Sequence, residues 1–194
     1  MSSRALVLAA HPCSESFNQA LHLEVVEGLK KAGWEVDDCD LYAEGFDPVL
    51  SETERRFYHE TETNTAPVQT YVDRLRAADA LVMVFPVWNF GYPAILKGFL
   101  DRVFLPGVSF RLVHGKVKPN LTHIRKLAAV TTYGGTRMRA VLAGDPPRHC
   151  VKRAVWHVCR PEKLRYLALY DMNRASEEKR GQFLKRVGRE MESF

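Results

Sequence analysis

Three short segments of the sequence carry residue types that could bind a ligand. The first is residues 11–18 (HPCSESFN), where serine and asparagine side chains stand beside an expected helix start. Free backbone N–H groups at such a start attract phosphate. The segment lacks the lysine and glycine spacing of a Walker A loop, and it lacks the G-x-G-x-x-G pattern. It therefore indicates either a phosphate site without magnesium or a simple capped helix.

The second segment, residues 85–93 (FPVWNFGYP), gathers aromatic side chains in a turn bracketed by prolines. Trp88, Phe90 and Tyr92 offer flat apolar surface, and Asn89 offers an amide. A planar heteroaromatic ring fits a wall of this kind, and so does the surface of a partner subunit. The two interpretations are compatible, because ligand sites at subunit interfaces also need apolar walls.

The third segment is residues 131–135 (TTYGG), which join hydroxyl side chains to two glycines. Glycine allows backbone N–H groups to approach a ligand closely. Donors arranged in this way could stabilise negative charge that develops on a reduced ring. The alternative is a turn that ends a strand and binds nothing.

The elements that would position these segments follow from the hydrophobic pattern. Five strands are expected: residues 34–42 alternate in polarity, as in a strand nearer an edge, and the others are residues 4–10, 78–86, 126–135 and 164–172. Helices are expected between and after them: following residues 14–16, from Ser51, from Pro67 to Ala78, over residues 93–104 and from Ser176. This alternation predicts an α/β fold with a parallel sheet. Such sheets bind ligands beyond the carboxyl ends of their strands, where all three segments fall.

The bulk composition fits one domain over residues 1–194, with 46% hydrophobic and 26% charged residues. No apolar run approaches the roughly 18 residues that a membrane span needs. The first apolar run, residues 5–10, is shorter than the about 7–15 residues of a signal-peptide core, and we interpret it as a strand. We expect a cytoplasmic protein without membrane insertion.

The four cysteines form no C-x-x-C pair, and reduced thiols are expected. A metal site built from His149, Cys150, His157 and Cys159 is a competing idea, but the spacings match no usual zinc pattern. We favour a single helix carrying these residues, and we expect no metal.

Charge is unevenly distributed along the chain. Residues 1–65 hold 13 acidic and 5 basic side chains, whereas residues 111–165 hold 13 basic and only two acidic ones, Asp145 and Glu162. The basic segment is either a solvated face or a site for an anionic partner, such as a nucleotide phosphate or nucleic acid. No helix-turn-helix, zinc-finger or RNA-recognition pattern is present, so nucleic acid is not expected.

At the same three segments the sequence resembles the NAD(P)H:quinone oxidoreductases of the DT-diaphorase type, which have a flavodoxin-like fold. The similar stretches are RALVLAAHP with SFNQAL, KKAGWEVDDCDLYAEGFDPVLS, FPVWNFGYPAILKGFLDRVF and LAAVTTYGG. They cover most of residues 4–110 and residues 125–135. The resemblance implies a three-layer sandwich around a five-stranded parallel sheet of order 2-1-3-4-5.

The resemblance also implies a bound flavin, held by three groups of residues. The phosphate and ribityl chain would contact the first group: His11, Ser16, Phe17, Asn18 and Ala20. The ring would lie on the second group: Pro86, Val87, Trp88, Asn89 and Phe90. The polar edge of the ring would meet the third group: Thr131, Thr132, Tyr133, Gly134 and Gly135. A homodimer is implied too, with each site completed by the second chain.

The activity implied is hydride transfer from NADPH or NADH through the flavin to a quinone or similar acceptor, in a ping-pong cycle. FMN is slightly preferred over FAD, whose adenosine side would lie on residues 108–122. The mammalian enzymes follow their two glycines with a catalytic Tyr and His, but here the segment is GGTRMRAVLAGDPPRH. Tyr133 is therefore the first candidate for the proton donor, and His149 is the second.

Basic side chains after the glycines would attract the dinucleotide phosphates, and these are Arg137, Arg139, Arg148 and Lys152. Two alternatives to an enzyme share the fold. One is a flavodoxin-like electron carrier, although known carriers are acidic and this chain has a formal net charge of +5. The other is a flavin-binding ancillary subunit of a potassium-efflux-type membrane system.

Overall fold

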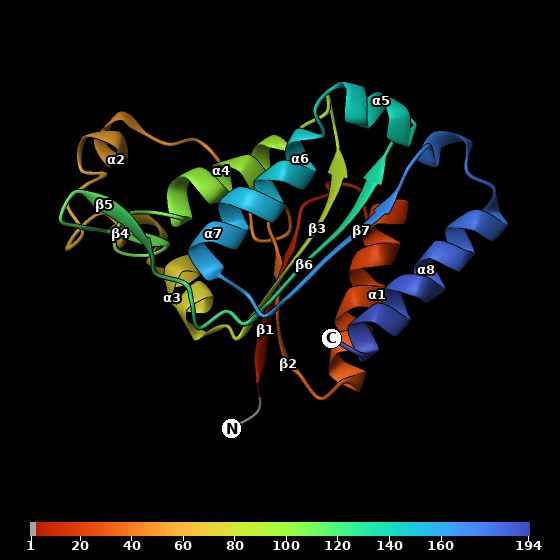
Figure 1. Ribbon diagram of the computed structural model, residues 1–194, viewed down its shortest axis with the longest axis horizontal. Helices are drawn as coiled ribbons and strands as arrows, with labels where there is room; N and C mark the ends of the chain where they lie inside the picture. Colours follow the sequence, from red (N-terminus) through yellow and green to blue (C-terminus); the bar gives the residue numbers. More distant parts are fainter. Residues whose placement is uncertain (1–2) are drawn as a thin grey trace.

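A computed structural model describes residues 3–194 of the chain. Its central sheet has five strands in the order β2-β1-β3-β6-β7, and every pairing between neighbours is parallel (Figure 1). The strands are β1 Arg4–Ala9, β2 Glu35–Asp40, β3 Ala80–Val87, β6 Lys126–Tyr133 and β7 Lys163–Leu169. Counted along the chain, β6 and β7 are the fourth and fifth strands of this sheet, so its order is 2-1-3-4-5. The predicted fold class and strand order are confirmed.

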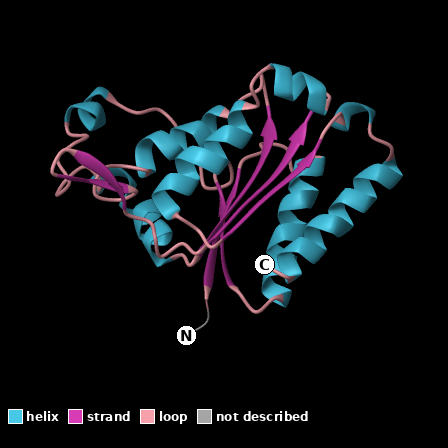
Figure 2. Ribbon diagram, viewed as in Figure 1, coloured by secondary structure: helices cyan, strands magenta, loops and turns pink. Residues whose placement is uncertain are grey.

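Helices cover both faces of the sheet and make three layers (Figure 2). On one face α1 (Phe17–Lys31) packs beside α8 (Glu177–Glu192). The opposite face carries the remaining long segments: α3 Gln69–Ala77, α4 Ala94–Val103 and the helical stretch formed by α6 Pro146–His149, the π-helix Cys150–Val155 and α7 Trp156–Cys159.

The apolar runs form central strands because successive side chains enter opposite layers. In β1, Ala5 and Val7 pack with α1 and α8, whereas Leu6 and Leu8 pack with α3 and α4. In β3 every residue up to Pro86 is buried. Helices therefore pack on both faces of the sheet, and its well-packed strands support the loops at the carboxyl edge.

Short polar side chains begin the helices at the predicted places. Ser16 caps α1 by accepting a hydrogen bond from the Gln19 N–H, and Ser176 caps α8 in the same way. Ser51 and Glu54 form the predicted capping box of α2 (Glu52–Arg56). Each cap satisfies backbone donors that a helix start leaves free.

Several elements differ from the sequence prediction. The hairpin of β4 (Phe110–Val113) and β5 (Lys116–Pro119) was not predicted, and neither was α5 (Arg137–Leu142). The last strand ends at Leu169 rather than at residue 172, because Asp171 takes a left-handed conformation with φ of 55°. A 3-10 turn, Ala66–Val68, precedes α3 where the prediction began the helix at Pro67.

Residues 3–194 contain neither a candidate membrane span nor a candidate metal site. No helix there is long and apolar enough to cross a membrane. No group of three or more His, Cys, Asp or Glu side chains there could hold a metal ion. His149, Cys150, His157 and Cys159 lie along the continuous helical stretch 146–159. All four cysteines of the chain are free thiols.

Candidate functional site

The three segments singled out in the sequence follow adjacent strands at the carboxyl edge of the sheet. β1 pairs with β3, and β3 pairs with β6 up to the pair Val87 and Tyr133. The ring of His11, after β1, packs edge to face against Trp88, after β3, with centroids 5.7 Å apart. The structure thus brings the first and second segments into direct contact.

The first segment wraps the amino end of α1. The Cys13 N–H donates to Nδ1 of His11 at 3.0 Å, and the Gln19 N–H donates to Ser16 Oγ at 3.1 Å. No acidic residue occupies the first turn of this 15-residue helix. Asn18 is only 4% exposed, and its Nδ2 atom has no hydrogen-bond partner. Backbone N–H groups at this end of α1 and the unused Asn18 donor both favour an anionic or polar ligand.

The second segment is a strained two-residue turn. Trp88 and Gly91 exchange backbone hydrogen bonds at 3.2 and 2.8 Å, and between them Asn89 and Phe90 have φ of 49° and 57°. A left-handed conformation costs about 1–2 kcal/mol for a side chain such as phenylalanine. Trp88 and Phe90 are 41% and 42% exposed, so core packing does not account for this strain.

Tyr92, which the sequence suggested as part of the exposed aromatic wall, lies instead against the interior. Its ring meets Phe85 at 4.8 Å, and its hydroxyl donates to the carbonyl of Pro147 at 3.0 Å. The exposed wall is therefore formed by Trp88 and Phe90, while Tyr92 anchors the turn to α6.

The third segment combines buried hydroxyls with an open glycine turn. Thr131 and Thr132 are buried, and Thr131 Oγ1 has no hydrogen-bond partner. A Cβ atom on Gly134 would come within 3.2 Å of Asn173 Nδ2, and the Gly135 carbonyl accepts from the Asp171 N–H at 2.8 Å. The glycines let the loop after β7 approach, so backbone groups of both loops meet at this edge.

Tyr133 belongs to a buried hydrogen-bonded cluster that the sequence did not reveal. Its hydroxyl donates to Asp145 Oδ1 at 2.6 Å and lies 2.6 Å from the Tyr166 hydroxyl. Burial, followed by the charges of Tyr166 and Asp145, raises the pKa of Tyr133 far above its usual range. Tyr133 is therefore neutral and bonded to Asp145, and a role as proton donor to a ligand stays a prediction.

The other proposed cationic and catalytic residues lie around this cluster. His149 is exposed at the end of α6, and its catalytic role also stays a prediction. Arg148 is paired with Asp145 Oδ2 at 2.9 Å and bonded to the Tyr170 hydroxyl at 2.7 Å. Arg137 and Arg139, by contrast, are exposed on α5 directly after the glycine turn. The exposed pair is better placed to attract a dinucleotide phosphate than Arg148.

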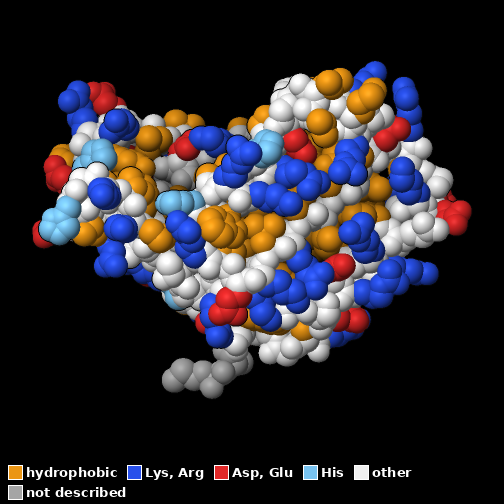
Figure 3. Space-filling view, viewed as in Figure 1, with side chains coloured by type: hydrophobic (Ala, Val, Ile, Leu, Met, Phe, Trp, Pro, Cys, Tyr) orange, Lys and Arg blue, Asp and Glu red, His pale blue; other side chains and the backbone are white. Residues whose placement is uncertain are grey.

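Lys and Arg side chains gather on the face that carries α7, β7 and α8 (Figure 3). This face combines part of the basic segment at residues 111–165 with the basic side chains of α8, which lies outside that segment. Asp145 was detectable there as one of only two acids among residues 111–165. The structure places Asp145 in the cluster, bonded to Tyr133 and Arg148.

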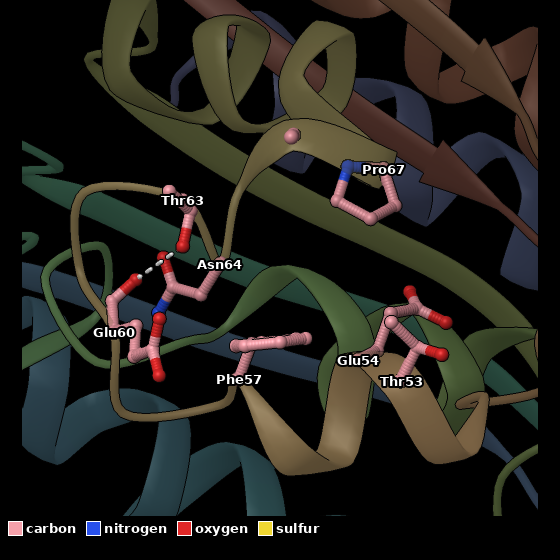
Figure 4. A pocket seen from close by; sticks show the side chains of 8 residues that line it. Thr53, Glu54, Phe57, Glu60, Thr63, Asn64 and Pro67 are labelled. Atoms are coloured by element: carbon pink, nitrogen blue, oxygen red, sulfur yellow. Dashed lines mark hydrogen bonds between the residues drawn. The ribbon is translucent and has the colours of Figure 1, made fainter.

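A separate pocket of about 320 Å³ lies among the residues between α2 and α3. In it the Phe57 ring lies between Glu54 on one side and Glu60 and Asn64 on the other (Figure 4). Asn64 Nδ2 donates to the carbonyls of Tyr58 and Pro106 at 2.9 and 3.0 Å. The pocket is lined by residues 53–67 and contains none of the predicted site residues.

A family model described as "Flavodoxin-like fold" matches residues 3–191. NAD(P)H dehydrogenase [quinone] 1 of Rattus norvegicus is 34% identical over 151 residues, which are 70% of this chain and 55% of that protein. An uncharacterized NAD(P)H oxidoreductase of Haemophilus influenzae is 27% identical over 180 residues, 90% of this chain and 87% of that one. The chain thus spans about half the length of the rat relative.

The solved structure of an NAD(P)H:quinone oxidoreductase from Methanothermobacter marburgensis matches with a TM-score of 0.84 and 25% identity. The match covers 100% of this chain and 97% of that one. These matches confirm the resemblance inferred from the sequence. They also extend past residue 135, where the stretches quoted for that resemblance end.

Proposed function

The chain belongs to the flavodoxin-like fold family, and on that premise we propose that it is a flavin-dependent NAD(P)H dehydrogenase acting on a quinone-like acceptor. The names of its relatives support this proposal. The observation that carries it is the contact of His11 with Trp88. That contact joins a helix start suited to a phosphate to an exposed aromatic wall suited to a ring.

The residues present fit a flavin. The buried Asn18 Nδ2 and Thr131 Oγ1 atoms both lack partners and lie on the first and third segments. The left-handed conformations of Asn89 and Phe90 hold the turn that presents the wall. Unused polar atoms and local strain at one sheet edge are features of a site formed for a ligand.

In this proposal the flavin would contact all of the residues suggested by the resemblance. His11, residues 16–18 and Ala20 would hold the phosphate and ribityl chain, residues 86–90 would face the ring, and residues 131–135 would meet its polar edge. A bound flavin would supply the two-electron chemistry between NADPH or NADH and the acceptor, in the ping-pong cycle that the resemblance implies. The protein orients the reactants, and its backbone N–H groups near Gly134 favour negative charge.

We also propose a homodimer, because the exposed Trp88 and Phe90 leave the wall open on one side. FMN stays slightly preferred over FAD; the adenosine side of FAD would reach residues 108–122, which fold largely as the β4–β5 hairpin. A cytoplasmic location stays a prediction. The electron-carrier and efflux-subunit alternatives are not favoured by relatives named as oxidoreductases.

The first test is an absorbance spectrum of the purified protein, followed by chromatography of the chromophore that heat releases. The two visible bands of an oxidised flavin are expected, and the chromatography names FMN or FAD. NADH and NADPH oxidation with a quinone is then measured. A protein that neither carries nor takes up flavin contradicts the proposed function, and the aromatic turn is then a subunit interface.

A further inference from the structure

The tyrosine cluster, which includes Tyr133, Asp145, Arg148 and Tyr170, ties together three segments that meet at the carboxyl edge of the sheet. The Tyr133 hydroxyl, from the glycine turn, and the Arg148 guanidinium, from α6, each bond one oxygen of the Asp145 carboxylate. Arg148 also bonds the hydroxyl of Tyr170, in the loop after β7. The Tyr170 ring lies 4.5 Å from the Tyr133 ring, which closes the cluster.

The short helix α6, which carries Arg148, also contacts the aromatic turn at residues 88–91 through Tyr92. Pro147, two residues after Asp145, accepts a hydrogen bond from the Tyr92 hydroxyl at 3.0 Å. Tyr92 directly follows Gly91, the last residue of the strained turn. Residues 145–148 are therefore bonded to the aromatic turn on one side and to the glycine turn on the other.

The backbone at Asp145 is bent to aim its carboxylate inward. Asp145 has φ of 40°, and Gly144 before it has φ of 79°. The Asp145 N–H donates to the Ala140 carbonyl at 2.8 Å, which ends α5. Glycine would adopt this conformation more easily, and the Asp145 carboxylate in this position bonds both Tyr133 and Arg148.

The charges within the cluster are balanced. Asp145 is 5% exposed, and Arg148 supplies the opposite charge at 2.9 Å. The Arg148 guanidinium also lies over the Tyr166 ring at 4.3 Å. A buried carboxylate with both oxygens bonded resists displacement, because breaking one bond leaves charge unpaired in a low-dielectric site.

We propose that Asp145 is a positioning residue that fixes the glycine turn and the aromatic turn relative to each other. The inference rests on the proposed function, since these turns are the segments assigned to the flavin ring and its polar edge. Asp145 itself acts through Tyr133, Arg148 and the backbone of α6. Rigid support of this kind matters because displacements of about 1 Å in a site can cost about a hundredfold in rate.

The test compares Asp145→Asn with Asp37→Asn in the full-length protein. Asp37 is the matched control, because its carboxylate is only 9% exposed and lies 2.7 Å from the Arg74 guanidinium, on β2 and outside all three segments. Tyr133→Phe is a second and milder variant. It deletes one hydroxyl but leaves the ion pair of Asp145 and Arg148 in place. Hydrogen exchange is measured by mass spectrometry on peptides covering residues 85–93 and 131–136, without added flavin.

We expect Asp145→Asn to speed exchange in both peptides by about tenfold, and Tyr133→Phe to do so by a smaller factor. Asp37→Asn should leave the exchange rates of both peptides unchanged. Each protein is measured at the same temperature interval below its own unfolding midpoint. Unchanged exchange in both peptides for both cluster variants overturns the inference, as does an equal effect of Asp37→Asn.

Titration of the proteins with FMN and FAD then separates this inference from the proposed function. A wild-type protein that binds no flavin contradicts the proposed function, while the exchange result still decides whether Asp145 joins the turns. If the wild type binds flavin, Asp145→Asn should weaken binding at least about tenfold. Binding by Asp145→Asn within twofold of wild type overturns the positioning role alone.

Discussion

The rings of His11 and Trp88 meet edge to face, with their centroids 5.7 Å apart. The two residues are far apart in the sequence, and each follows a strand of the adjacent pair β1 and β3. Because both strands are buried on both faces, the contact has little freedom to shift. It gives the candidate site a fixed corner, where the helix start proposed to bind a phosphate meets the aromatic side chain of Trp88.

Replacing Trp88 by alanine should weaken flavin binding with little loss of stability. The side chain is 41% exposed, so its removal leaves no core cavity. Loss of the aromatic contact should cost about 1–2 kcal/mol of binding, or roughly tenfold in affinity. Fluorescence titration with flavin measures the affinity. Leu23→Ala, at an exposed position of α1, is the control and should bind flavin as wild type does.

Two serine caps separate a structural effect from a binding effect. Ser16→Ala and Ser176→Ala each delete a side chain that accepts one backbone N–H, at the starts of α1 and α8. Each should lower the free energy of unfolding by about 1 kcal/mol. Only Ser16→Ala should also weaken flavin binding, because only α1 begins at the candidate site. Equal binding by both variants would contradict a phosphate position at α1.

Glu54 should make stability depend on acidity. Burial alone would raise its pKa, but hydrogen bonds from Ser51 and Arg102 outweigh burial and lower the pKa below 4.5. A carboxylate with a depressed folded-state pKa contributes stability that is present above its unfolded pKa and lost as the pH falls through the folded value. Denaturant unfolding from pH 7 to pH 3 should therefore show a loss on acidification that is smaller in Glu54→Gln. An identical pH dependence in both proteins would rule out this contribution.

The four thiols should differ sharply in reactivity. Cys13 is exposed beside the start of α1, whereas Cys39 and Cys159 are buried. Burial raises the pKa of Cys159 to about 12 and that of Cys39 further. At pH 8 a thiol reagent should modify Cys13 rapidly, and should modify Cys39 and Cys159 only after unfolding. Cys13→Ser should remove the rapid phase, and bound flavin should slow it several-fold in the wild type.

Local sequence determined the strands of the central sheet and the residues at which several helices begin. The uninterrupted apolar runs of β1 and β3 predict buried parallel strands, because only strands covered on both faces tolerate them. Ser16, Ser51 and Ser176 mark helix starts, since a short oxygen-bearing side chain satisfies a free backbone N–H within three residues. The three candidate segments follow from the same logic, as they come directly after strands of a parallel sheet.

Only the tertiary structure decided how Tyr133 and Tyr92 are used. Both stand in segments predicted to face a ligand, yet one bonds Asp145 and the other bonds the Pro147 carbonyl. These contacts join residues 12 and 55 positions apart in the chain. They depend on the bend at Asp145, whose left-handed conformation is uncommon for residues other than glycine. The sequence specifies these two hydrogen bonds only through the whole fold, because the packing of other elements brings the bonded residues together.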